Sequence, residues 1–180
     1  GEDDYNGQKL FVDELTAIQD KGFEGDRCFG QASRQVLILS TESLNQFGYS
    51  PGDLRADFSD PESLRALVRR LNPDVIVNSA AHTAVDKAES EPELARALNA
   101  LAPGVVAEAA AELGAVMVHY STDYVFDGSG TQPRDESAPT GPLSVYGRTK
   151  LEGEQRVAAS GCRHLILRTS WVYAARGGNF

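Results

Sequence analysis

Cysteine, methionine and tryptophan are scarce in this 180-residue chain, which contains two cysteines, one methionine and one tryptophan. Cys28 and Cys162 lie far apart, and no paired spacing indicates a metal site or a disulfide framework. We therefore interpret both cysteines as reduced thiols and assign no metal ion from the sequence.

Long apolar runs and an excess of positive charge are also lacking. No stretch approaches the ~18 consecutive apolar residues of a membrane span, and no basic segment followed by an apolar run resembles a signal peptide. Asp and Glu (26) outnumber Lys and Arg (17), so the formal net charge is -9. Nucleic acids and anionic membranes bind clustered cations, so neither is an expected partner, although local donors can hold a small phosphate ligand. A cytoplasmic location is the default expectation.

Apolar residues make up 41% of the chain, which is enough for one domain with a buried core. Short apolar runs alternate with helical segments along most of the sequence. Strands are expected at 35–39, 74–78, 115–120 and 164–168, and helices at 61–71, 91–114 and 144–159. Strands that are apolar throughout and alternate with helices predict a doubly wound, Rossmann-like α/β fold, with a parallel sheet and helices on both faces.

Local signals mark where two of these helices begin, end or bend. Asp60 before Pro61 combines an N-cap with a first-turn proline. Asn72 and the proline after it end this helix. Pro103 predicts a distortion within the longer helix at 91–114.

The N-terminal part is less regular. Residues 9–20 place their apolar side chains near one helical face, which predicts a helix. The Gly-rich, polar segment 22–33 predicts a loop. We therefore divide the chain into an atypical N-terminal segment, 1–34, and a Rossmann-like domain, 35–180.

Tyr146 and Lys150 form the first chemically informative pair. Residues four apart on a helix share a face. A free tyrosine has a pKa of ~10, and a nearby ammonium lowers it, which turns a tyrosine into a usable general acid. Taken alone, the spacing is common, and two solvated surface residues are the simpler interpretation.

A second polar cluster, residues 121–128, directly follows a predicted buried strand. A hydroxyl at Ser121 or Thr122 could donate a hydrogen bond to a substrate carbonyl oxygen as negative charge develops on it. The alternative is that these residues and Asp123 only cap the next turn.

A third cluster, residues 78–89, follows another predicted strand. Its small residues allow a ligand to approach the backbone closely. His82 within it, considered alone, is more often a structural hydrogen-bonding residue than a catalyst. The three clusters all fall at the carboxyl ends of predicted strands or on the next helix, where open α/β sheets bind their ligands.

Four segments together carry a family resemblance. They are NSAAHTAVDKAE (78–89), HYSTDYVFDG (119–128), PLSVYGRTKLEGE (142–154) and RTSWVY (168–173). In this order they resemble the signature segments of dTDP-4-dehydrorhamnose reductases, in the extended short-chain dehydrogenase/reductase superfamily. The resemblance runs from about Leu54 to Phe180. The TAVDKAE and RTSWVY segments favour this family over sugar-nucleotide epimerases.

The resemblance implies an NADPH-dependent oxidoreductase, with NADH as the other cofactor to consider. Its reaction would be the reduction of dTDP-4-dehydro-6-deoxy-L-mannose (dTDP-4-dehydrorhamnose) to dTDP-L-rhamnose, in nucleotide-sugar and cell-wall polysaccharide biosynthesis. The expected partner is the dTDP-linked deoxy-sugar, and the resemblance allows a homodimer. The hydride chemistry belongs to the cofactor, while the protein supplies orientation and a proton.

The resemblance also implies residue roles. Tyr146 would donate a proton to the sugar C4 oxygen, Lys150 would lower the tyrosine pKa and hold the nicotinamide ribose, and Thr122 would bind the reacting carbonyl. Asp123 would lie beside it, and Trp171 would pack against substrate unless it is a core tryptophan. The other residues expected to contact the cofactor are Asp57, Phe58, Ala81, His82, Thr83 and Tyr120. Core packing is an equal alternative for the phenylalanine.

Two departures from the family pattern keep other interpretations open. The family's Gly-rich pyrophosphate turn is degenerate here, because neither Asn6–Gln8 nor Gly25–Gly30 matches it well. Family members also continue past the position of Phe180 with a small domain that holds most of the nucleotide-sugar, so we expect this fold to be incomplete. The alternatives are a non-catalytic regulatory relative, similar to the methionine adenosyltransferase beta subunit, and an inactive truncated product.

Overall fold

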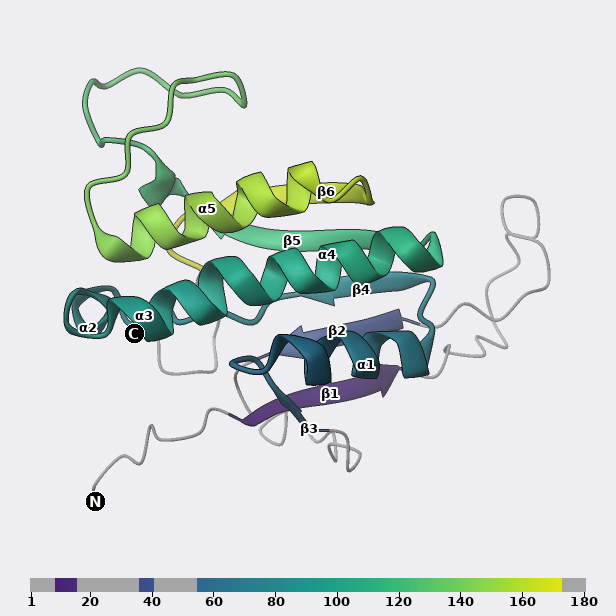
Figure 1. The fold of residues 1–180 in the computed structure, drawn as a ribbon. Helices are drawn as coiled ribbons and strands as arrows, with labels where there is room; N and C mark the ends of the chain where they lie inside the picture. Colours follow the sequence, from purple (N-terminus) through teal and green to yellow (C-terminus); the bar gives the residue numbers. More distant parts are fainter. Residues whose placement is uncertain (1–8, 16–35, 41–54, 173–180) are drawn as a thin grey trace, which may run out of the picture.

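The computed structural model describes residues 9–15, 36–40 and 55–172, which form one six-stranded sheet covered by helices (Figure 1). The strand order is β3-β1-β2-β4-β5-β6. The strands are β1 (Lys9–Leu15), β2 (Val36–Ser40), β3 (Arg55–Asp57), β4 (Val75–Asn78), β5 (Val116–Thr122) and β6 (Arg163–Thr169). The four strands expected from apolar runs, β2, β4, β5 and β6, are confirmed, and they pair in parallel.

The prediction of a helix at 9–20 is wrong, because residues 9–15 form β1. This strand pairs antiparallel with β2, from Phe11 opposite Ser40 to Leu15 opposite Val36. It also pairs antiparallel with β3. Two ladders of backbone hydrogen bonds outweigh a weak local helical preference. The rest of that predicted helix, the predicted loop at 22–33 and both candidate Gly-rich turns lie outside the described residues.

Helix α1 (Pro61–Leu71) confirms the predicted capping signals. The Asp60 side chain accepts hydrogen bonds from the backbone N–H groups of residues 62 and 63, at 3.2 and 3.1 Å. At the other end, Asn72 adopts a left-handed conformation with φ of 46° and donates its N–H to Val68 O. The cap and the stop together define α1 on both sides.

The expected helix at 91–114 consists of three pieces. They are α3 (Pro92–Arg96), a π-helical turn, η2 (Ala97–Leu101), and α4 (Ala102–Leu113). The predicted distortion is confirmed, but it lies one turn before Pro103. Proline has no N–H to offer the carbonyl four residues earlier, which belongs to Asn99, so the hydrogen-bond pattern widens there.

Helices α1, α4 and α5 (Val145–Ala159) lie side by side in front of the sheet (Figure 1). Within the part of the chain that the structure describes, the helices cover this one face. The core fills the space between them and the sheet, with Ile76 and Met117 from the strands against Leu64, Val106 and other apolar residues of the helices. No described helix is long and apolar enough to cross a membrane.

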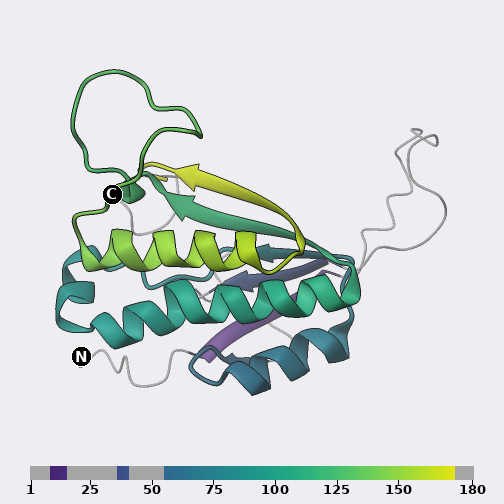
Figure 2. The same cartoon turned by 45° about the horizontal axis from the view of Figure 1, so that its top comes forward.

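Strands β2, β4, β5 and β6 end at the same edge of the sheet, where α5 begins (Figure 2). Strand β3 runs in the same direction as β2, since both are antiparallel to β1. The topology therefore places the carboxyl ends of five strands along one edge, where α/β folds bind their ligands.

Candidate active site

The three residues expected to be catalytic meet at this edge. Thr122 ends β5, and Tyr146 and Lys150 lie one turn apart on α5. The Thr122 side chain hydrogen-bonds the Tyr146 hydroxyl. The Tyr146 ring also packs edge-on against Tyr124, with centroids 5.5 Å apart. The structure therefore faces the phenol toward the threonine, as a proton donor beside a carbonyl-binding hydroxyl requires.

Tyr146 is kept protonated by its surroundings. Burial raises its pKa above the usual value, the hydrogen bond with Thr122 acts in the opposite direction, and Asp123 and Tyr124 raise it further. The groups that shift this pKa in the present arrangement do not include Lys150, so the expected effect of the lysine on the tyrosine stays a prediction. The Lys150 ammonium donates to the backbone carbonyl of Tyr120 at 2.7 Å. The tyrosine is therefore a neutral phenol at neutral pH.

Lys150 is a buried cation at the centre of the site. Its side chain is buried, which lowers its pKa to about 8, while Glu154 acts to raise it. A lysine in this condition remains largely charged at neutral pH but loses its charge easily above it. Perturbed titration of this kind is common where chemistry takes place.

His119 lies near enough to Lys150 to be influenced by its charge, and it stays uncharged. It is fully buried, and burial together with Lys150 lowers its pKa to about 3. Its Nδ1 lies 3.1 Å from the Asn78 amide nitrogen, which can only donate, so the proton of the ring is on Nε2. The neutral imidazole adds no second cation beside Lys150. Sequence analysis did not single out this residue.

Asn99, a second residue that sequence analysis missed, ties two motifs together. Its Oδ1 accepts from the backbone N–H of His82 at 2.8 Å, and its Nδ2 donates to the carbonyl of the same residue at 3.2 Å. The same amide donates to Thr149 Oγ1 at 3.1 Å, and that hydroxyl donates to the Tyr146 carbonyl at 2.9 Å. Asn99 therefore holds the loop after β4 against α5.

The π-helical turn makes this contact possible. A side chain in place of Gly153 on α5 would overlap the Asn99 carbonyl oxygen, so only glycine allows the close approach. The available sequence signal was a proline four residues after an asparagine, combined with a glycine on the partner helix. Neither of these signals is specific unless the contact between the two helices is already known.

The loop after β4 carries the expected cofactor contacts. Ala81 and His82 are buried, whereas Thr83 and Tyr120, the latter two residues before the end of β5, are exposed. Within the described residues, the buried His82 Nδ1 and Ser121 Oγ have no hydrogen-bond partner. Unsatisfied polar atoms beside small residues fit a polar ligand at this edge, so these residues are compatible with a dinucleotide.

Asp57 and Phe58 lie at the carboxyl end of β3, along the same edge. The Asp57 carboxylate accepts from Ser59 N at 2.8 Å and Ser59 Oγ at 2.6 Å, and these bonds lower its pKa. The Phe58 side chain is 2% exposed within the core, as the alternative interpretation proposed. The exposed carboxylate therefore remains the candidate for contact with a cofactor.

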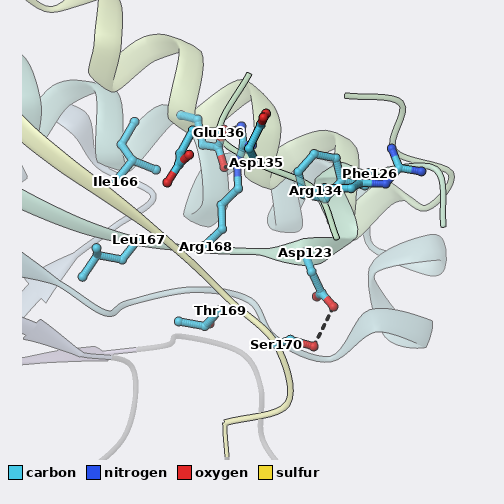
Figure 3. A pocket seen from close by; sticks show the side chains of 11 residues that line it. Asp123, Phe126, Arg134, Asp135, Glu136, Ile166, Leu167, Arg168, Thr169 and Ser170 are labelled. Carbon is cyan, nitrogen blue, oxygen red and sulfur yellow. Dashed lines mark hydrogen bonds and ion pairs between the residues drawn. The ribbon is translucent and has the colours of Figure 1, made fainter. Parts of the chain in front are cut away.

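Asp123 connects the ends of β5 and β6. Its carboxylate accepts from Thr122 Oγ1 at 3.2 Å and from Ser170 Oγ at 2.7 Å, the latter drawn in Figure 3. Trp171, which follows, is 72% exposed with a left-handed φ of 45°. The alternative of a core tryptophan is therefore wrong, and the indole is at the surface beside the site.

A pocket of about 490 Å³ adjoins Asp123 along the outer edge of β6 (Figure 3). Arg134 and Arg168 approach the Phe126 ring, at 5.2 and 5.1 Å from its centroid. Arg168 forms two hydrogen bonds with the Glu154 carboxylate, at 2.9 and 2.7 Å. Arg134 pairs with Asp127 at 2.6 Å. Both guanidinium groups are therefore already neutralised by protein carboxylates.

Comparison with known proteins identifies the family. The family model described as "RmlD substrate binding domain" matches residues 29–180. This chain belongs to that family. Relatives include the dTDP-4-dehydrorhamnose reductase of Salmonella typhimurium, 60% identical over 124 residues, which are 69% of this chain and 42% of the relative. The enzyme of the same name from Escherichia coli K12 is 54% identical over 146 residues, 81% of this chain and 49% of the relative.

Solved structures agree with the RmlD assignment. A dTDP-4-dehydrorhamnose reductase from Bacillus anthracis, in complex with NADP, matches with a TM-score of 0.66 and 39% identity, over 69% of this chain and 44% of that one. The Rossmann-like fold class is therefore confirmed. The chain spans a little under half the length of the curated relatives that it matches.

Proposed function

We propose that this RmlD-family chain is the dinucleotide-binding and catalytic part, residues 35–180, of an NADPH-dependent dTDP-4-dehydrorhamnose reductase. The observation that carries the proposal is the meeting of Thr122, Tyr146 and Lys150 at one edge of the sheet. The names of the curated relatives and the NADP complex of the Bacillus anthracis relative support it. They favour a reductase over a non-catalytic regulatory relative.

Each residue has a role set by its position. NADPH held at this edge would supply the hydride for reduction of the C4 ketone of the sugar. The Tyr146 hydroxyl holds the proton that the C4 oxygen receives, so that hydride and proton together form the alcohol. Thr122 offers a hydroxyl to the same oxygen, and Asp123, hydrogen-bonded to it, orients that hydroxyl.

The cofactor-side residues would hold the nicotinamide half. Lys150, anchored on the Tyr120 carbonyl, would donate to the nicotinamide ribose hydroxyls. The loop Ala81–Thr83 would contact the cofactor through its backbone and through the partnerless His82 Nδ1. Asp57 would lie toward the adenosine end. Trp171, exposed beside Asp123, would pack against the sugar.

NADPH binding tests the proposal directly. A ligand that binds only the native state at a concentration of about 100 times its Kd stabilises that state by roughly 2.7 kcal/mol, so NADPH should raise the Tm of the chain. Lys150→Met should remove most of this increase, whereas the control Lys87→Met should retain it. No shift in Tm at millimolar NADPH would contradict the proposed cofactor role.

A further inference from the structure

Glu89 makes a contact that the proposed reaction does not use. This residue belongs to the TAVDKAE segment and lies on helix α2 (Val85–Ser90), which follows the cofactor-side loop. Its Oε1 accepts a hydrogen bond from the backbone N–H of Val145, 56 residues away, at 2.7 Å. Val145 is the first residue of α5 and directly precedes Tyr146.

The start of α5 lacks an acidic side chain of its own. Ser144 caps it by accepting from the Gly147 N–H at 3.0 Å, but its first turn contains no acidic residue. In a capping box, a glutamate or glutamine would stand three residues after the cap, at Gly147. A side chain there would overlap the Tyr124 carbonyl oxygen. A carboxylate near the positive end of this helix dipole must therefore come from another element, and Glu89 is placed to supply it.

We propose that Glu89 is a positioning residue that fixes the first turn of α5, and with it the direction of the Tyr146 hydroxyl toward Thr122. The inference rests on the proposed reductase function for its kinetic consequence. Glu89 does not touch the phenol, so it acts through the backbone. Because α2 continues directly from the Ala81–Thr83 loop, the same contact keeps the proton donor in register with the cofactor side of the site.

Three variants separate positioning from general stability. Glu89→Ala removes the acceptor, and Glu89→Gln retains an oxygen at the same place. Glu93→Ala removes an exposed acid from the neighbouring helix α3 as a matched control. With NADPH and dTDP-4-dehydrorhamnose, we expect kcat to fall by roughly tenfold in Glu89→Ala, since small misplacements of a catalytic group are costly. The KM for NADPH should change little, and Glu89→Gln should recover most of the loss.

Amide exchange provides a readout that does not depend on turnover. Loss of the acceptor should speed hydrogen exchange of the backbone amides of 145–148 by roughly tenfold in Glu89→Ala, with little change in Glu89→Gln or Glu93→Ala. Unchanged exchange in Glu89→Ala would overturn the inference whatever the activity. Faster exchange with unchanged kcat would also overturn the positioning role. A wild-type chain that binds no NADPH, but shows the exchange pattern, would instead contradict the proposed function alone.

Discussion

Two polar regions of this molecule contain buried charge, and they treat it differently. Around Lys150, the ammonium is buried against a backbone carbonyl, and its pKa falls to about 8. Around Arg168, the guanidinium is paired with the buried Glu154 carboxylate, and the pKa of the arginine rises. A charge held without an opposite charge in direct contact is easily moved or neutralised, whereas a paired charge mainly supports structure.

Glu154 joins the two regions, because it pairs with Arg168 and also acts on the pKa of Lys150. The Glu154 carboxylate on α5 thus pairs directly with Arg168 and acts electrostatically on Lys150 from a distance. Position relative to a partner, rather than burial alone, therefore decides whether a charged residue is available for chemistry.

The largest effect on activity should come from a variant in the region around Lys150. Tyr146→Phe removes the proposed proton donor but keeps the ring packed on Tyr124, so we expect turnover to fall by at least about 100-fold while the Kd for NADPH changes by less than about threefold. Steady-state kinetics and fluorescence titration with NADPH measure the two quantities. Comparable kcat values for the variant and the wild type would show that another group delivers the proton.

A variant in the region around Arg168 should instead change the stability of the fold. Glu154→Ala leaves Arg168 without its partner, and we expect a loss of roughly 2 kcal/mol in the free energy of unfolding, below the value for a fully buried pair because the arginine is partly exposed. Glu152→Ala, two residues away, breaks more exposed ion pairs with Arg96 and Arg156 and should cost less than about 1 kcal/mol. Urea denaturation measures the loss of stability in both variants. Equal losses would contradict the expected difference between the buried and the more exposed ion pairs.

A smaller effect should appear in the pH dependence of NADPH affinity. Lys150 is charged below its pKa of about 8 and loses its charge as the pH rises through that value. The Kd for NADPH should therefore increase above pH 8, by up to roughly tenfold per pH unit. Lys150→Arg should move this rise beyond pH 10, since arginine keeps its charge. A pH-independent Kd between 7 and 9.5 in the wild type would rule out this role for Lys150.

The lowered pKa of Lys150 also makes the stability of the fold depend on pH. Here a rise in pH is favourable, in contrast to its effect on NADPH affinity. The folded pKa of Lys150 lies below its unfolded value of 10.5, so the unfolded chain binds more protons between pH 8 and 10.5. The contribution of this group to the free energy of unfolding therefore increases as the pH rises through that range.

Sequence patterns predicted the features that depend on near neighbours. Asp60 and Pro61 marked the start of α1, and the apolar runs located β2, β4, β5 and β6. Residues 9–15 were mistaken for a helix, because their strand forms only between two partners far away in the chain. The spacing of Tyr146 and Lys150 was informative, yet the direction of the lysine toward Tyr120 was not visible in it.

The amino-acid sequence alone determined the fold class, the family and the chemical types of the proposed catalytic residues, because helix periodicity, capping and motif order are properties of short segments. The hydrogen bonds of Asn99 and Glu89 to α5, and the neutral state of Tyr146 beside a lysine that donates elsewhere, follow only from the tertiary structure. Burial and hydrogen-bond partners come from residues tens of positions apart, and the folded arrangement is what brings them within about 3 Å of each other.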